Sequence, residues 1–177
     1  MTAGMTEPRQ IVLALGSNLG DRPANLQAGL DALAARPGLD LVAVSGVYQT
    51  RPVGGPQQPD YLNAVLLASS DLPAMRILRL CQAAEQAVGR DRSPQAVRWG
   101  PRTLDVDLIT CDGETSDAPE LTLPHPRAHM RAFVLAPWHD VDPVATLPGH
   151  GPVADLLGQV GLDGVTLLPE LSLRIEG

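Results

Sequence analysis

The apolar residues of this chain of 177 residues lie in short runs, and the spacing within the runs alternates between strand-like and helical. IVLAL at 11–15 is continuous and apolar, as is typical of a buried strand. Asp21 and Pro23 then suit the first turn of a helix. Leucines recur at helical spacing over 26–33, and Pro37-Gly38 ends the pattern. The sequence therefore predicts a strand followed by a helix over its first 38 residues.

The same alternation continues to residue 110. Strands are expected at 41–48 and 61–68, a second helix between Asp71-Pro73 and Gly89, and a half-exposed strand at 103–110. The stretches 50–60 and 89–102 read as loops. The order strand, helix, strand, strand, helix, strand predicts an α/β (α+β) fold, a ferredoxin-like sandwich with helices packed on one face of an antiparallel sheet. Beyond it lie an apolar stretch at 132–138 and a tail at 151–177, which we expect to hold one or two weak elements with no assigned role.

Length and composition predict an ordinary globular chain. We expect residues 1–177 to form one domain, and 44% apolar residues with 19% charged residues exclude a disordered tail. Cys81 and Cys111 are too few for a disulfide framework, and the N-terminus lacks an apolar signal core. No apolar run reaches the ~18 residues that span a bilayer. We expect a cytoplasmic protein with reduced thiols and no membrane partner.

All thirteen basic residues are arginine. The lack of lysine excludes a Schiff base, a pyridoxal phosphate anchor and a glycine-rich phosphate loop that ends in lysine. A net charge of −7 argues against nucleic acid as a partner. Four of the arginines lie in the short segment 90–102, directly before an acidic half of the chain. Any phosphate bound by this chain must be bound by guanidinium groups.

Asp105 and Asp107 are candidate metal ligands. In the expected strand at 103–110, Leu104, Val106 and Leu108 share one face, so both carboxylates point to the other. Two carboxylates this close repel unless a cation lies between them, and their hard oxygens suit magnesium bound together with phosphates. The alternative is an acidic outer face of the sheet, and a second D-x-D motif at 140–142 shows that the pattern alone is common.

The arginines that precede this pair strengthen the metal hypothesis. Arg90, Arg92, Arg98 and Arg102 could share with a cation the negative charge of a polyphosphate. They could instead be surface residues that compensate an acidic protein. His125 and His129 have the spacing of zinc ligands, but no cysteine lies nearby and Pro126 separates them.

Asn63 is a polar residue in an otherwise apolar strand. Its amide has a donor and an acceptor edge that would match a heterocyclic amide, although pairing with a backbone loop is the commoner role of such a residue. Tyr61 and Phe133 could supply flat faces for a flat ligand. Gly16 to Gly20, GSNLG, lack the dinucleotide-binding glycine pattern and are interpreted as a turn into the first helix.

Four segments together resemble the 6-hydroxymethyl-7,8-dihydropterin pyrophosphokinases of folate biosynthesis. They are LALGSNLGDR at 13–22, QPDYLNAV at 58–65, RWGPRTLDVDLI at 98–109 and LTLPHPRAHMRAFVLAPW at 121–138. They cover roughly residues 10–140 in the order of the family, and RWGPRTLDVD is its most specific part.

The resemblance implies that the chain transfers pyrophosphate from ATP to 6-hydroxymethyl-7,8-dihydropterin and releases AMP. It implies two Mg²⁺ ions bound with ATP on Asp105 and Asp107. Arg90 and Arg92 match arginines of a mobile loop that supports the transition state. The implied ATP-binding residues are Gln82, Glu85, Arg90, Arg92, Arg102, Thr122, His125 and Arg131. The implied pterin-binding residues are Thr50, Pro52, Val53, Tyr61, Asn63, Trp99 and Phe133.

Two positions depart from the pattern of the family. Arg51 stands where proline or an acid is frequent, and Glu120 where some members place a basic ATP contact. The alternative function is a ferredoxin-like module that binds a nucleotide or a pterin without catalysis, which would release no AMP. Oligomeric state, rate-limiting step and protein partners are open at this point.

Overall fold

The computed structural model describes residues 7–52, 57–89 and 103–175. Its strands are β1 (Arg9–Ser17), β2 (Asp40–Val44), β3 (Tyr48–Thr50), β4 (Tyr61–Ser70), β5 (Asp105–Cys111), β6 (Ser116–Ala118), β7 (Leu121–Leu123), β8 (Thr146–Leu147), β9 (Gly151–Pro152) and β10 (Val165–Leu167). Its helices are α1 (Arg22–Ala34), α2 (Ala74–Ala87), the 3₁₀-helix η1 (Ala128–Met130), α3 (Ala132–Val141) and α4 (Val153–Val160).

The main sheet is antiparallel and has β1 at its centre. The strand order is β10-β3-β4-β1-β5, with β2 also paired to β4. Leu13 of β1 lies opposite Leu66 of β4 and Leu108 of β5. The ferredoxin-like fold predicted from the sequence is therefore confirmed. The expected single strand at 41–48 is wrong in detail, because β2 and β3 are separated at Ser45 to Val47 and pair with different parts of β4.

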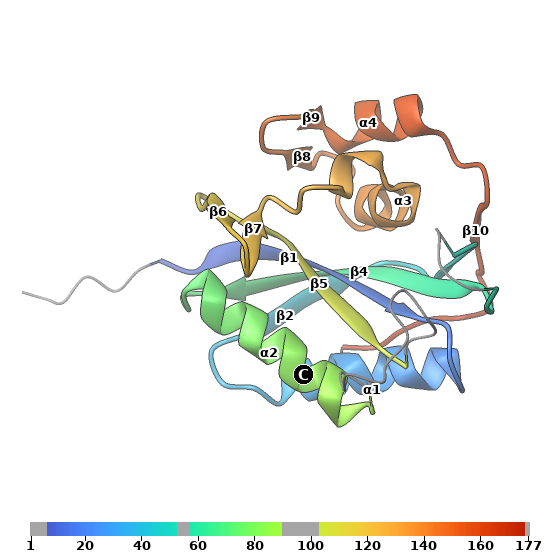
Figure 1. The fold of residues 1–177 in the computed structure, drawn as a ribbon, viewed down its shortest axis with the longest axis horizontal. Coiled ribbons are helices and arrows are strands. Elements are labelled where there is room, and N and C mark those ends of the chain that lie inside the picture. The colour runs from blue at the N-terminus through green and yellow to red at the C-terminus, as the bar shows by residue number, and fades with distance from the viewer. Residues whose placement is uncertain (1–6, 53–56, 90–102, 176–177) are drawn as a thin grey trace, which may run out of the picture.

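Helices cover both faces of this sheet, not one as expected. Helices α1 and α2 lie on one face, and α3 and α4 lie on the other (Figure 1). The two faces of β1 show the reason, since Leu13 belongs to the apolar cluster under α1 and α2 while Val12 belongs to the cluster under α3. A strand that is apolar on both sides needs a layer on each. The stretch at 132–138 supplies the second layer as part of α3.

The first two helices begin in different ways. The Asp21 carboxylate accepts a hydrogen bond from the Ala24 N–H at 3.2 Å and caps α1, with Pro23 in the first turn as expected. Helix α2 begins at Ala74, and Pro73 takes the N-cap position without a side-chain bond. The helix thus begins directly after the stretch Asp71-Pro73, as expected.

Strand β5 is half-exposed only where it begins. Asp105 and Asp107 are partly exposed, whereas Ile109 on the same face is buried against α3 and α4. The opposite face, with Val106 and Leu108, is buried along its length. The strand expected at 103–110 is thus confirmed with its polar face confined to the first half.

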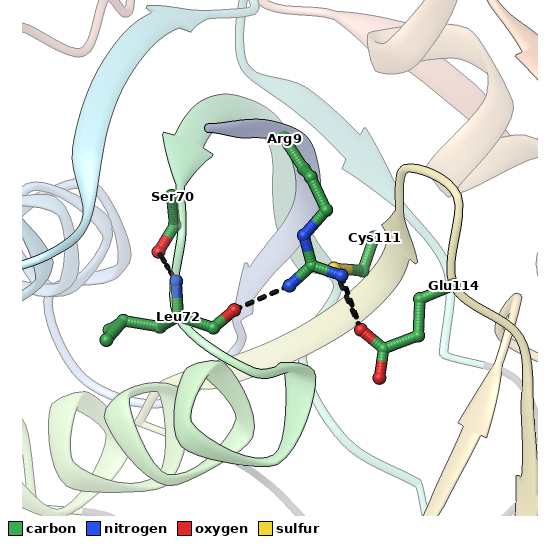
Figure 2. A network of polar contacts seen from close by, with 5 residues as sticks. All are labelled: Arg9, Ser70, Leu72, Cys111 and Glu114. Carbon is green, nitrogen blue, oxygen red and sulfur yellow. Dashed lines mark hydrogen bonds and ion pairs between the residues drawn. The ribbon is translucent and has the colours of Figure 1, made fainter. Parts of the chain in front are cut away.

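One polar network ties the start of β1 to two distant turns (Figure 2). The Arg9 guanidinium donates to the Glu114 carboxylate and to the Leu72 carbonyl, both at 2.6 Å. The Cys111 thiol donates to the same carboxylate at 3.6 Å, and burial raises the pKa of this thiol to about 11. These bonds join β1 to the turn after β5 and to the segment before α2, at the end of the sheet away from Asp105.

The tail that follows α4 crosses from one face of the sheet to the other. Strand β10 pairs with β3 at the sheet edge, and the segment 168–175 then runs beside α1 (Figure 1). Its apolar residues pack on the cluster under α1 and α2: Leu168, Leu171, Leu173 and Ile175. The Gln27 amide of α1 donates to the Arg174 carbonyl at 2.8 Å and accepts from its N–H at 2.9 Å. The segment therefore completes the core.

None of the helices in the described part of the chain has the length and apolar character that crossing a membrane requires.

Gln27→Ala should loosen the segment 168–175. The substitution removes both hydrogen bonds to Arg174 and leaves the apolar contacts, so we expect faster amide exchange in this segment and a loss of at most about 1 kcal/mol in the free energy of unfolding. Hydrogen exchange followed by mass spectrometry measures the first effect. Gln86→Ala, at an exposed position of α2, is the matched control. Unchanged exchange at 168–175 would contradict the anchoring role of Gln27.

Candidate active site

A cavity opens on the α3 face of the sheet, at the end where β1 finishes and β5 begins. Its walls come from β1, β3 and the loop after it, β4, β5, the residues on either side of η1, and α3. The lining residues are Ala14, Leu15, Gly16, Thr50, Arg51, Pro52, Gln58, Tyr61, Asn63, Asp105, Asp107, Arg127, Arg131 and Phe133. Eight of these are site residues that the sequence analysis named: Thr50, Pro52, Tyr61, Asn63, Asp105, Asp107, Arg131 and Phe133.

Gly16 of β1 lines the cavity between β4 and β5. It pairs with Asn63 of β4 on one side and with Asp105 of β5 on the other. A Cβ at this position would lie 3.0 Å from the Asn63 Oδ1 and 3.3 Å from the Tyr61 ring, so glycine lets these side chains approach β1 closely. The interpretation of GSNLG as a turn is wrong for Gly16 and Ser17, which belong to β1; the turn begins after them.

Asp105 and Asp107 share the cavity face of β5. Leu104, Val106 and Leu108 are buried on the opposite side, as the alternation predicted. Between the two aspartates the Val106 N–H donates to the Glu85 carboxylate of α2 at 3.0 Å. This buried glutamate is 1% exposed and holds β5 against α2 from the far face of the sheet.

The donor set fits a hard cation that shares its coordination with a ligand. No group of three or more His, Cys, Asp or Glu side chains in the described ranges could enclose a metal ion. Two carboxylates on one strand face leave coordination positions for phosphate and water oxygens, which is the usual arrangement for Mg²⁺. Asp140 of the other D-x-D motif has a different role, since its Oδ2 accepts the Gly46 N–H at 2.9 Å.

The opposite wall is aromatic and amidic. Tyr61 and Asn63 of β4 and Phe133 of α3 all line the cavity. The buried Asn63 amide donates to the Thr50 hydroxyl at 2.7 Å. Asn63 is therefore both structurally paired, although with a side chain and not a backbone loop, and part of the cavity wall.

Arg131 and Phe133 lie together at the start of α3. The Arg131 guanidinium carbon is 5.4 Å from the centre of the Phe133 ring, within the range of a cation–π contact. The carbonyl of Arg131 accepts the N–H groups of Val134 and Leu135, each at 3.0 Å, so this residue also starts the helix. This contact thus links an aromatic residue and a positively charged residue of the cavity wall.

His125 lies beside the cavity as a neutral imidazole. The backbone N–H of His125 donates to the Ile109 carbonyl at 2.8 Å, and the ring Nδ1 accepts the Arg127 backbone N–H at 3.2 Å. The pKa of His125 is lowered to about 4, chiefly by burial and then by the positive charges of Arg131 and Arg127, which outweigh the opposite effect of Asp105. Because Nδ1 accepts, the ring proton sits on Nε2, which makes this atom a donor.

The other residues of the sequence analysis lie elsewhere. Gln82 accepts from Arg79 on α2 at 3.0 Å, and the Thr122 hydroxyl donates to the Ala118 carbonyl at 3.3 Å. With His125 and Glu85, they are not among the residues that line the cavity. His129 is stacked on His150 with ring centres 4.0 Å apart. Five named site residues lie outside the described residues: Val53, Arg90, Arg92, Trp99 and Arg102.

Sequence reasoning missed Gly16, Gln58 and Arg127 as cavity residues. Gln58 had no signal in the sequence, since it lies in a loop; the Asn18 amide fixes it by donating to its Oε1 at 2.9 Å. Arg127 belongs to the HPRAHMR stretch that also holds Arg131, and only the course of η1 brings it to the cavity. Arg51, noted as a departure, lines the cavity as well.

Comparison with known proteins gives relatives over most of the chain. The model of the 7,8-dihydro-6-hydroxymethylpterin-pyrophosphokinase (HPPK) family matches residues 12–143. A 2-amino-4-hydroxy-6-hydroxymethyldihydropteridine pyrophosphokinase of Mycobacterium tuberculosis is 46% identical over 164 residues, which cover 85% of this chain and 84% of that protein. The enzyme of the same name from Pseudomonas aeruginosa is 38% identical over 161 residues, covering 91% of this chain and 98% of that one.

Among solved structures, a Plasmodium falciparum HPPK-DHPS variant with pterin and p-hydroxybenzoate has a TM-score of 0.67 at 12% identity. The match covers 89% of this chain and 45% of that chain, so this chain spans less than half of it. At this identity the likeness concerns the fold alone. The family match over most of the chain and the identities of the relatives show that the chain belongs to the 7,8-dihydro-6-hydroxymethylpterin-pyrophosphokinase family.

Proposed function

We propose that this cavity is where the chain carries out the reaction of its family: transfer of pyrophosphate from ATP to 6-hydroxymethyl-7,8-dihydropterin, with release of AMP. One observation supports this site above all. Asp105 and Asp107 on β5 and Tyr61 and Asn63 on β4 line the same cavity and flank the same strand, β1. Strands lie about 4.8 Å apart, so the two sets are separated by about 10 Å, a distance that a pterin and its hydroxymethyl group can span.

In this reaction the hydroxymethyl oxygen attacks the β-phosphorus of ATP. A new O–P bond forms, the bond from the β-phosphorus to the oxygen shared with the α-phosphate breaks, AMP leaves, and the hydroxyl proton goes to solvent. Mg²⁺, when bound, would neutralise phosphate oxygens and polarise the β-phosphoryl group. The chain's part is to hold the two substrates in line and to stabilise the charge that develops.

Asp105 and Asp107 are proposed to hold two Mg²⁺ ions together with the polyphosphate. Arg131 is proposed to contact the phosphates from α3, and its contact with Phe133 fixes its direction. Arg90, Arg92 and Arg102 are proposed as further phosphate contacts on the grounds of the family pattern. His125 would donate from Nε2 to an anionic oxygen, which a neutral imidazole can do without a change of charge.

The pterin is proposed to lie between Tyr61 and Phe133, with its amide edge on Asn63. An asparagine offers both a donor and an acceptor, which a pterin amide edge requires. Thr50 orients this amide through its hydroxyl, and Pro52 borders the same wall. Val53 and Trp99 are proposed to complete the pocket.

Three nucleotide contacts implied by the family pattern stay proposals: Gln82, Glu85 and Thr122. Glu85 already has a structural bond to Val106, so a nucleotide contact would have to use what remains of its carboxylate. The names of the relatives do not favour the noncatalytic alternative, since those quoted are pyrophosphokinases. A cytoplasmic location stays a prediction from the sequence.

Asp105→Asn and Asp107→Asn should each lower turnover by about three orders of magnitude, because several kcal/mol of charge stabilisation depend on a bound cation. The measurement is AMP release from ATP, Mg²⁺ and the hydroxymethyl dihydropterin. Asp117→Asn, exposed on β6, is the matched control and should retain wild-type rates. If both site variants stay within tenfold of wild type while folded, the two aspartates have no part in the reaction. No AMP release by the wild-type chain would refute the proposed function.

Asn63→Ala should weaken pterin binding about 10-fold to 100-fold, since it removes hydrogen bonds that a buried ligand amide cannot make elsewhere. Calorimetric titration with the pterin in the presence of an ATP analogue measures the affinity. Nucleotide affinity should change by less than twofold, because Asn63 lies across β1 from the aspartates. An equal loss for both ligands would show that Asn63 serves the fold and not pterin recognition.

His125 should stay neutral down to about pH 4 in the folded chain. The pKa of His125 is lower in the folded chain than in the unfolded chain. The neutral imidazole therefore contributes fully to the free energy of unfolding above pH 6.5, and this contribution is lost as the pH falls from 6.5 towards 4. A two-dimensional NMR titration of the imidazole nitrogens reports the pKa and the Nε2–H tautomer. A His125 pKa of 6 or above would refute both the burial argument and the neutral donor role.

A further inference from the structure

Arg127 is a cavity residue to which neither the sequence pattern nor the residues implied by the family resemblance give a role. Its side chain lines the same cavity as Asp105, Asp107 and Arg131. The residue is exposed, whereas its neighbour Ala128 is completely buried under α3. Arg127 therefore lies at the edge of the cavity, and the residue that follows it is anchored in the core.

Three hydrogen bonds hold the start of η1 in place. The Arg127 N–H donates to the His125 Nδ1 at 3.2 Å, and its carbonyl accepts the Met130 N–H at 3.1 Å. His125 is bonded in turn to the Ile109 carbonyl of β5 at 2.8 Å. The Cα of Arg127 is thus fixed relative to β5, the strand that carries the two aspartates, and only the side chain is left to move.

The guanidinium of Arg127 adds to a positive region of the cavity. In the described ranges one ion pair is found, between Arg9 and Glu114, and it lies at the other end of β1. Arg131 lines the same cavity, and the charges of both arginines lower the pKa of the partly buried His125 imidazole. Two guanidinium groups that line one cavity repel each other unless an anion lies between them.

We propose that Arg127 binds phosphoryl oxygens of the nucleotide at the mouth of the cavity, as a partner of Arg131. The polyphosphate is the strongly anionic part of the substrates, and guanidinium groups bind such oxygens in a bidentate manner. The inference rests on the proposed function for the identity of the anion. Because Arg127 is exposed, its contribution goes to nucleotide affinity more than to the chemical step.

The test is nucleotide binding by Arg127→Ala in the full chain, with a non-hydrolysable ATP analogue and Mg²⁺. We expect the dissociation constant to rise about 10-fold, the value of a charge-assisted hydrogen bond at a partly solvated site. Arg127→Lys keeps the charge and should recover part of the loss. Pterin affinity, measured separately, and the melting temperature should be unchanged. The nucleotide affinity of the variant should also fall less steeply with salt than that of wild type.

Arg36→Ala, at an exposed position after α1, removes the same charge from a site outside the cavity lining and should leave all these values at wild type. Nucleotide affinity of Arg127→Ala within twofold of wild type would overturn the proposal. So would an equal loss for nucleotide and pterin, or a lower melting temperature that accounts for the loss. Absence of AMP release by the wild-type chain would instead refute the proposed function, since the binding measurements with the analogue do not depend on turnover.

Discussion

The register of β1 between β4 and β5 decides which side chains meet in the cavity. Gly16 faces Asn63 on one side and Asp105 on the other, so one residue of β1 aligns the amide wall with the acidic wall. Side chains alternate between the faces of a strand, and a slip of one residue in either pairing would turn its polar groups into the core under α1 and α2. The apolar residues on both faces of β1 make such a slip costly, because Leu13 and Val12 are each buried in a different cluster.

The second helical layer completes what the sheet alone cannot form. A ferredoxin-like sheet with helices on one face would leave Asn63 and Asp105 on an open surface. Helix α3 covers that face with Val134, Leu135 and Trp138, and its first turn directs Arg131 and Phe133 over the cavity. The same burial that stabilises α3 therefore supplies one wall of the proposed pterin site. The segment 168–175 lies on the opposite face of the sheet, against the cluster under α1 and α2. Its link to the cavity is indirect, through the pairing of β10 with β3.

What could be predicted from the sequence depended on local periodicity. The alternation around Asp105 and Asp107 sufficed to place both carboxylates on one face, because a period of two is a property of the strand itself. The break between β2 and β3 could not be predicted, since Gly46 is held by Asp140, 94 residues away. The layer of α3 and α4 was not predicted, although the continuous apolar run at 11–15 indicated it. A strand that is apolar on both sides requires a layer of helices or strands on each side. Arg127 lacked any signal, because η1 alone brings it to the cavity.

The choice of arginine over lysine has a consequence for how the site responds to pH. Guanidinium groups keep their charge at every physiological pH, and His125 is neutral throughout that range because burial and two neighbouring arginines oppose its protonation. The positive side of the cavity, as far as the structure describes it, is therefore a constant charge and not a titrating one. A change in phosphate binding near neutral pH must then come from the ligand, whose terminal phosphate has its own ionisation. Residue type thus keeps the positive charge of the cavity constant, and the bonds around His125 and Arg127 hold the backbone that carries part of it.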